Sequence, residues 1–264
     1  RKQQQAIITV YNLNPNSENA MILEGNRVII EAGYVGEQYG VIYTGTIIQP
    51  YRSKENGTDY KLTLICRDSD QYLTYGLVNG VLRSKASMRQ AVDMCATKAT
   101  YPTQVGNILN SQMTYPRGKV MFGKSSEYIE QIARSDNAIY YQSDGKVNII
   151  SAVPLNKDEA YDIGPETGLI GTPTQNNNGI TCKTLLNPNI TLYSMIHIDN
   201  TKVSQAQYSS GDYIRQLDSQ GLYKVIQIKY DGDTRGNSWY TELTAVSQEG
   251  ELPQMSLGAY FYNG

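Results

Sequence analysis

One stretch of eight residues has the spacing of a phosphate-binding loop. Residues 118–125 read GKVMFGKS, so that Gly118, Gly123, Lys124 and Ser125 match the pattern G-x-x-x-x-G-K-[ST]. Such a loop binds nucleotides when a buried strand leads into the first glycine, backbone amides curl around the phosphate and a helix begins at the last position. The pattern therefore has to be judged by the elements that would surround it.

The elements predicted around this stretch do not suit a nucleotide. Pro116 and Arg117 stand where an apolar strand would be needed, and the helix expected over 125–134 leads into an antiparallel hairpin rather than a parallel crossover. We therefore interpret the match as accidental, in a loop whose Phe122 inserts into a small module and whose Ser125 caps the helix. We therefore expect that the protein binds no nucleotide and uses no cofactor.

The remaining polar side chains do not predict a catalytic or metal site either. His197 is the only histidine, so a multi-histidine metal site is excluded, and it alternates with apolar residues in a manner typical of a strand surface. Two carboxylate pairs, Asp68 with Asp70 and Asp231 with Asp233, could serve glycoside cleavage. Both pairs stand at strand ends, where aspartate commonly forms turns, and we favour that interpretation.

The composition favours a β-rich protein with large contact surfaces. Tyrosine accounts for 22 residues against 2 Phe and 1 Trp, and tyrosine suits half-buried sheet faces and wet interfaces. The net charge of −2 provides no general basic field for nucleic acid, and no apolar run reaches membrane-spanning length. Three widely spaced cysteines indicate free, buried thiols in a protein made in a reducing cytoplasm.

The two ends of the chain show the pattern of strands. Alternating or β-branched segments occupy 6–13, 27–34, 40–51 and 60–68, with a helical turn over 17–23. The pattern returns after Pro154, in 180–186, 190–198, 221–230 and 239–247. We predict a mainly β fold in which two antiparallel β-barrel-like domains, 1–83 and 154–264, flank a helix-containing insert. Which barrel takes up residues 154–180 stays open.

The insert, residues 84–153, reads as a small α+β module. Ser87 and Gln90 form a capping box before a helix over 87–98, and a second helix covers 125–134. Residues 101–117 read as a loop. Strands over 138–142 and 147–152 flank a hairpin turn.

A weak internal echo suggests that the two β domains are related. At a constant offset of 181 residues, Gly40 aligns with Gly221 and Ile47 with Ile228, and Leu62 and Thr63 align with the Leu-Thr pair at 243–244. Both segments have the layout strand, polar loop, strand. A duplicated barrel-like unit would account for this layout.

Several segments in this order resemble the phage tail and baseplate hub family that includes late-control-protein-D-like hub proteins. The opening segments VYNLNP (10–15), GNRV (25–28), EAGY (31–34) and GVIYTG (40–45) are similar to the first barrel of that family. VMFGKS (120–125) with its helix and hairpin is similar to the middle module. GLIGTP (168–173), LLNPNI (185–190), GLYKV (221–225), GDTRG (232–236) and WYT (239–241) are similar to the closing barrel.

The resemblance implies a structural role in the virion tail, without catalysis. It implies a homotrimer whose two barrels per subunit make a ring of six units, which adapts the tail spike to the sixfold tail tube around a central channel. Tail spike, tail tube, tape measure and baseplate wedge proteins would be its partners, and DNA would only pass through. The family also implies a leading strand ahead of Arg1.

Two other functions compete with this hypothesis. One is a tail-associated enzyme, either a cell-wall hydrolase or a nucleotide hydrolase that uses Lys124 and Ser125. The other is a host-surface carbohydrate-binding module that exposes tyrosines. The apolar, aromatic segment 255–262 follows the last predicted strand, and we expect it to dock on a neighbouring subunit.

Overall fold

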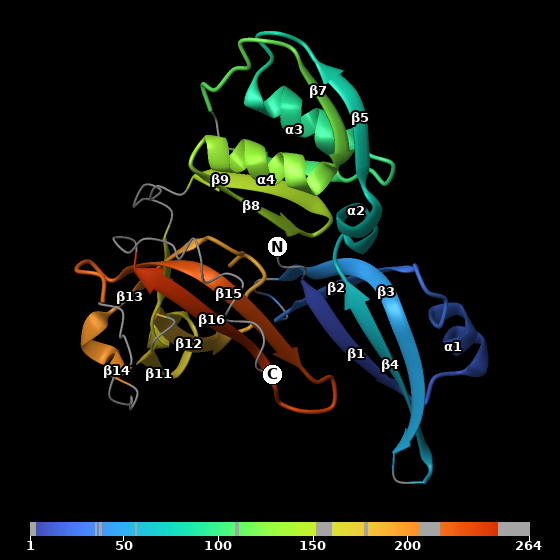
Figure 1. Ribbon diagram of the computed structural model, residues 1–264. Coiled ribbons are helices and arrows are strands. Elements are labelled where there is room, and N and C mark those ends of the chain that lie inside the picture. The colour runs from blue at the N-terminus through green and yellow to red at the C-terminus, as the bar shows by residue number, and fades with distance from the viewer. Residues whose placement is uncertain are drawn as a thin grey trace, which may run out of the picture. The chain divides into compact units, whose positions relative to one another are not determined.

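The computed structural model describes residues 4–34, 36, 39–55, 57–108, 111–151, 160–176, 179–205 and 217–247 (Figure 1). The chain forms two compact units. The first unit comprises Arg1–Ile30 and Tyr43–Val153, and the second comprises Glu31–Ile42 and Pro154–Gly264. The fold is mainly β with curled, half-barrel sheets, which confirms the predicted fold class. The expected docking segment, 255–262, lies outside the described residues.

A four-stranded sheet opens the chain, in the spatial order β1-β4-β3-β2. Its strands are β1 (Gln5–Tyr11), β2 (Arg27–Gly33), β3 (Tyr39–Glu55) and β4 (Asp59–Arg67), each at a predicted position, and α1 (Pro15–Met21) connects β1 to β2. Alternation places the apolar side chains on one face, because successive residues of a strand point to opposite sides. The buried centre of that face consists of Tyr43, Ile47, Leu62, Leu64 and Cys66.

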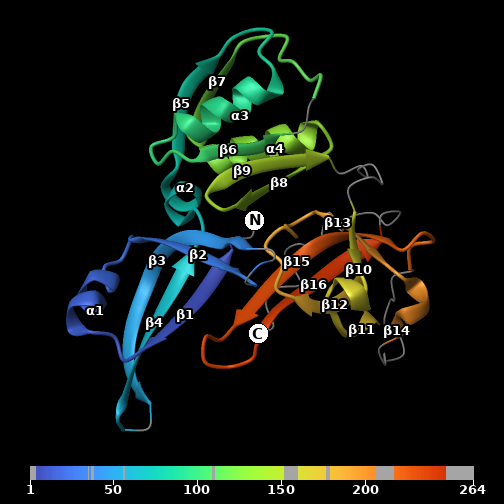
Figure 2. The same cartoon turned by 180° about the vertical axis from the view of Figure 1, so that it is seen from behind.

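The helical module follows, and it contains more strands than the sequence predicts. Its elements are α2 (Asp70–Tyr75), β5 (Leu77–Leu82), α3 (Met88–Thr97), β6 (Gln104–Ile108), β7 (Lys119–Lys124), α4 (Ser125–Ser135), β8 (Ala138–Ser143) and β9 (Lys146–Ser151). β5 pairs with β7 in a two-stranded ribbon, and β6, β9 and β8 form a separate sheet, seen from behind in Figure 2. The segment expected to be a loop, 101–117, therefore contributes strand β6.

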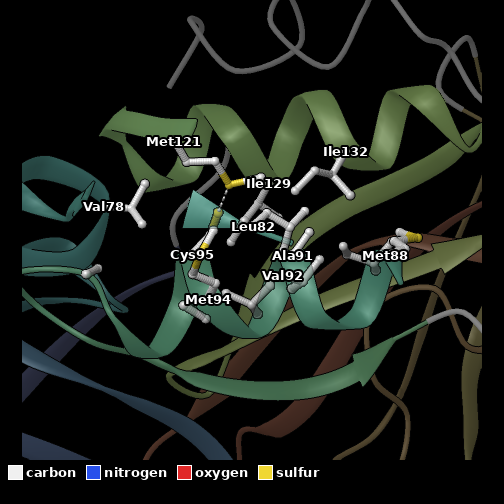
Figure 3. Close-up of a cluster of buried hydrophobic side chains, with 14 of the residues drawn as sticks. Val78, Leu82, Met88, Ala91, Val92, Met94, Cys95, Met121, Ile129 and Ile132 are labelled. Atoms are coloured by element: carbon white, nitrogen blue, oxygen red, sulfur yellow. Dashed lines mark hydrogen bonds between the residues drawn. The ribbon is translucent and has the colours of Figure 1, made fainter. Parts of the chain in front are cut away.

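The two main helices of the module pack around one core. The predicted capping box is confirmed, since the Ser87 hydroxyl accepts from the amide of Gln90 and the Gln90 side chain accepts from the amide of Ser87. α3 contacts β5 and β6, whereas α4 contacts β7 and β8. Figure 3 shows the side chains that fill the space between them. Within it the Cys95 thiol donates to the Met121 sulfur at 3.5 Å.

The second unit contains a seven-stranded sheet in the order β10-β13-β15-β16-β12-β11-β14. The strands are β10 (Tyr161–Ile163), β11 (Leu169–Asn176), β12 (Gly179–Leu185), β13 (Met195–Ile198), β14 (Ser204–Gln205), β15 (Leu222–Gly232) and β16 (Trp239–Ser247). The central pairs are antiparallel, while the edge pairs β10–β13 and β11–β14 are parallel. The buried face includes Ile180, Cys182, Tyr223, Val225 and Leu243.

A segment from the N-terminal part of the chain belongs to the second unit. The Tyr34 hydroxyl donates to the carbonyl oxygen of Trp239 at 2.8 Å. A Cβ on Gly40 would lie 3.4 Å from the Pro188 side chain, so this glycine allows a close approach. These contacts join residues far apart in sequence, which local patterns do not reveal. The three-part division at 83/84 and 153/154 stays a proposal.

The two segments of the internal repeat share the predicted layout of strand, loop and strand, but the residues that are identical at offset 181 differ in their strand pairing. Ile47 pairs with Cys66, whereas Ile228 pairs with Leu243, so the identities at offset 181 do not occupy equivalent places. The two hairpins do share a bulge on their first strand, between Ile47 and Gln49 in β3 and between Val225 and Gln227 in β15. The shared bulge corresponds to an offset of 178, and bulges increase local strand twist in both sheets.

The three cysteines are free and buried, as the sequence predicts. Burial raises the pKa of Cys95 and of Cys182 to about 12, and it also raises the pKa of Cys66. These thiols therefore stay protonated near neutral pH and act as small apolar side chains.

Candidate assembly surface

The residues of the phosphate-loop pattern lie in a strand-to-helix corner. Lys119–Lys124 forms strand β7, which pairs antiparallel with β5 from Leu77 opposite Lys124 to Leu82 opposite Lys119. A phosphate cradle requires successive amides that curve towards one point, whereas amides of an extended strand alternate in direction. Gly118 directly precedes this strand, and only Gly123 within it has a positive φ, of +141°.

The helix after the pattern does not offer its first amide to a ligand. α4 begins at Ser125, whose backbone N–H donates to the carbonyl oxygen of Gly76 at 2.9 Å. Both Ser125 and Ser126 are fully buried. The sequence-based expectation that Ser125 caps the helix is wrong, because the cap position is Lys124 and no side chain caps it. The Gly76 carbonyl thus takes one of the backbone donors that an anion would need.

Phe122 also departs from its predicted place. Its side chain is exposed rather than inserted into the module, and the buried residue of β7 is Met121. Strand alternation explains the difference, since neighbours in an extended chain point to opposite faces. Val120 and Phe122 therefore share the outer face of the ribbon.

The first carboxylate pair is divided between two structural roles. Asp68 is buried, and its carboxylate accepts from the Ser69 hydroxyl at 2.7 Å and from the backbone amide of Gly145 at 3.0 Å. Asp70 begins α2. Burial raises the pKa of the Asp68 carboxyl, against the opposing effect of the hydrogen bonds from Ser69 and Gly145. Asp68 thus fastens the β8–β9 turn to the end of β4.

Replacing Asp68 with asparagine is expected to preserve this contact without a buried charge. Because the folded-state pKa lies above the ordinary value of 3.8, stability falls as the pH rises through the interval between the two. Asp68→Asn should therefore be at least as stable as the parent at pH 7 and lose that advantage below the ordinary pKa. Denaturant unfolding followed by circular dichroism at both pH values measures this.

Alanine provides the matched comparison at Asp68. Asp68→Ala leaves the Gly145 amide without its acceptor and should cost about 1–3 kcal/mol of the free energy of unfolding. If Asp68→Asn proves as unstable as Asp68→Ala at pH 7, the charge itself is required and our account is incorrect.

In the second carboxylate pair, Asp233 forms a turn as expected, whereas Asp231 lies within strand β15 opposite Tyr240. The Asp233 carboxylate accepts from the amide of Arg235 at 2.9 Å, and the Asp233 amide donates to the carbonyl of Ser238. Asp231, near the end of β15, lines a polar hollow of about 420 Å³ on the sheet of the second unit. In that hollow, Lys183 lies 3.9 Å from the centre of the Tyr240 ring and so covers one face of it.

His197 is a strand-surface residue, as predicted. Its Nδ1 atom lies 2.9 Å from a carboxylate oxygen of Asp162, and both side chains are exposed. The register of the parallel pair β10–β13 places the two residues opposite each other. Among the residues that the structure describes, no group of three or more histidine, cysteine, aspartate or glutamate side chains could hold a metal ion.

A feature that sequence reasoning missed is the outer face of the β5–β7 ribbon. Leu77, Val81, Val120 and Phe122 are exposed apolar residues on this face. The residues that alternate with them along the same strands point to the other face and belong to the core, namely Val78, Leu82 and Met121. Contiguous exposed apolar side chains commonly mark an interaction site. We call these four residues the ribbon face.

The fold of the chain is similar to that of two solved tail proteins. A 43 kDa tail protein of prophage MuSo2 from Shewanella oneidensis is similar with a TM-score of 0.54 and 8% identity, over 94% of this chain and 89% of that one. A tail protein from Neisseria meningitidis MC58 gives 0.50 and 9%, over 92% and 91%. At such identities the likeness concerns the fold.

A third similar structure comes from a secretion system. The Escherichia coli c3393 protein has a TM-score of 0.53 and 8% identity, over 93% of this chain and 70% of that one. It is described as a component of the type VI secretion system with structural similarity to the T4 bacteriophage tail proteins gp27 and gp5.

The sequence itself identifies the family. The Baseplate hub gp41 family matches residues 2–215, and the chain belongs to this family. It is a hub protein of the phage tail baseplate, which confirms the resemblance noted in the sequence. No curated protein sequence matches the chain. Among the described residues, no helix has the length and apolarity needed to cross a membrane.

Proposed function

We propose that this hub protein forms a homotrimeric ring that adapts the threefold tail spike to the sixfold tail tube. The observation that carries the proposal is that one chain contains two similar hairpins. Each curled sheet contains a long antiparallel hairpin with one bulge on its first strand, β3–β4 in one and β15–β16 in the other. Three copies with two similar units each would present six units around a central channel.

The resemblance to the hub family supplies the partners that we propose. The ring would contact the tail spike on one side and the tail tube on the other, with baseplate wedge proteins around it. The tape measure protein and then DNA would pass through its channel. The protein would be made in the bacterial cytoplasm and act in the virion tail.

We further propose that the role is structural rather than enzymatic. The pairing of β7 with β5 leaves Lys124 and Ser125 without a curved loop of amides, which speaks against nucleotide hydrolysis. The turn contacts of Asp233 and the buried contacts of Asp68 speak against a pair of catalytic carboxylates. The Lys183 side chain over Tyr240 speaks against sugar stacking in the polar hollow.

Native mass spectrometry of the isolated chain at high protein concentration is expected to show trimers. Two open, curled sheets per subunit leave strand edges that neighbouring copies would cover, and covered edges lower the free energy of the ring. A stable dimer with no trimer at any concentration contradicts the proposed ring.

The same preparation tests the enzymatic alternative. Zymography on peptidoglycan should show no clearing, and nucleotide hydrolysis should be at background both for the parent and for Lys124→Ala. Hydrolysis by the parent that Lys124→Ala abolishes would establish the phosphate-loop interpretation instead.

A further inference from the structure

The ribbon face is a continuous apolar surface. The exposed fractions of Leu77, Val81, Val120 and Phe122 are 55%, 69%, 67% and 76%. Val81 lies directly opposite Val120 in the ladder. Phe122 lies opposite Asn79 and therefore diagonal to both Leu77 and Val81. Direct and diagonal neighbours of this kind are within side-chain reach of each other, so the four side chains form one patch.

The backbone beside the patch is held by other parts of the module. The Tyr128 hydroxyl lies 3.2 Å from both the amide nitrogen and the carbonyl oxygen of Phe122. On the other strand, the Leu77 carbonyl accepts from the amide of Thr100 at 2.9 Å. The edge of β7 at Phe122 and the edge of β5 at Leu77 are therefore already bonded. Another molecule would meet the side chains of this face rather than pair with its strands at these positions.

The ribbon lies in the most basic part of the chain. Residues 76–124 contain seven basic residues and one acidic residue, although the whole chain has a net charge of −2. Arg83, Lys85 and Arg117 are exposed at the end of the ribbon where Val81 faces Val120. An apolar patch beside a basic cluster favours a partner surface that is acidic and partly apolar.

The second unit of the same protein has the opposite charge. Glu31–Ile42 with Pro154–Gly264 contains 14 acidic and 7 basic residues, a net charge of −7. The first unit contains 11 acidic and 16 basic residues, a net charge of +5. The basic first unit of one copy therefore attracts the acidic second unit of another copy, whereas like units repel each other. We call the contact between unlike units head to tail.

We propose that the ribbon face of one copy docks on the acidic second unit of another copy. Such a contact joins two different surfaces, and it closes into a ring when the same rotation is repeated. The inference rests on the ring of the proposed function and specifies which surface joins its members. Phe122, the most exposed of the four side chains, is the central anchor.

Sedimentation velocity of the full chain tests the contact. Phe122→Ser and, separately, Val81→Ser should each weaken self-association at least tenfold, because both remove an anchor from the interface without touching the core. Tyr51→Ser, which removes an exposed aromatic residue of β3 outside the ribbon, should leave association unchanged. Unchanged circular dichroism melting shows that each variant folds.

Salt and mixing test the head-to-tail arrangement. Association of the parent should weaken as ionic strength rises, because the attraction is between units of opposite charge. The Phe122→Ser variant keeps its acidic unit, so it should still bind one parent molecule and stop ring growth. Salt-independent association, absence of mixed complexes, or an equal loss in Tyr51→Ser overturns the proposal.

The failure of this inference is distinguishable from failure of the proposed function. If the parent, Phe122→Ser and Val81→Ser all form trimers equally well, the proposed ribbon contact is wrong and the proposed ring still stands. If the parent stays monomeric at every concentration, both the ribbon contact and the ring are wrong.

Discussion

Replacing Ile129 with alanine is expected to lower the free energy of unfolding of the first unit by about 2–5 kcal/mol. Ile129 is fully buried on α4, and Figure 3 places it between Met121 of β7 and the side chains of α3. The substitution removes apolar volume at the point where the two helices and the ribbon meet. The surrounding residues belong to several elements, so they cannot all move to fill the cavity.

Hydrogen exchange localised to α4 by mass spectrometry measures this loss. The matched control is Arg134→Ala on the same helix, which removes only an exposed ion pair with Glu130 and should cost about 0.5 kcal/mol or less. Equal protection of α4 in the two variants would mean that the module core does not hold the helix in place. Since α4 also holds Tyr128 against Phe122, Ile129→Ala should weaken self-association as well.

The sequence predicted those elements whose signal is local. The helix after Ser87 combines a capping box with apolar residues at helical spacing, and both features need only a dozen residues. The strands of the first sheet alternate clearly because one of their faces is buried. For these elements, local propensity and burial agree, so the pattern alone suffices.

The ribbon could not be predicted in the same way. Its strands carry apolar residues on both faces, buried Val78 and Leu82 beside exposed Leu77 and Val81, so the alternation that marks a strand is missing. The run Val120-Met121-Phe122 has the same ambiguity, and reading it as a core insertion placed Phe122 inside. A surface that mimics a core in sequence becomes visible only when the pairing of β5 with β7 is known.

Whether residues 118–125 can bind a phosphate depends on the elements around them rather than on the residue pattern. The sequence indicated that Gly118–Ser125 lacked the strand and crossover of a nucleotide site, and β7 paired along β5 fits that interpretation. That the match is accidental remains a prediction until hydrolysis is measured. The polar hollow and the fastening role of Asp68 could not be foreseen, because both depend on contacts between distant segments.

Replacing Gly221 with alanine is expected to destabilise the second unit by about 3–5 kcal/mol. Gly221 has a φ of +70°, a conformation that costs residues with a side chain. In addition, a Cβ at this position would lie 2.4 Å from the carbonyl oxygen of Ile198 and 3.3 Å from the His197 ring. The Gly221 carbonyl also accepts from the Ile198 amide at 2.8 Å, so the chain cannot shift away without losing this hydrogen bond at the end of the β13–β15 pairing.

Gly171→Ala separates the two causes within the same unit. Gly171 has nearly the same φ, +72°, but nothing lies within 4 Å of its would-be Cβ, so alanine there carries only the conformational cost of about 1–2 kcal/mol. Denaturant unfolding followed by the fluorescence of Trp239, the only tryptophan, reports on this sheet for both variants. Equal losses would mean that the approach of Ile198 is relieved at no cost. A much larger loss at Gly221 would show that the close approach of the Gly221 and Ile198 backbones stabilises the pairing of β13 with β15. This sheet belongs to the acidic second unit, on which we propose that the ribbon face docks.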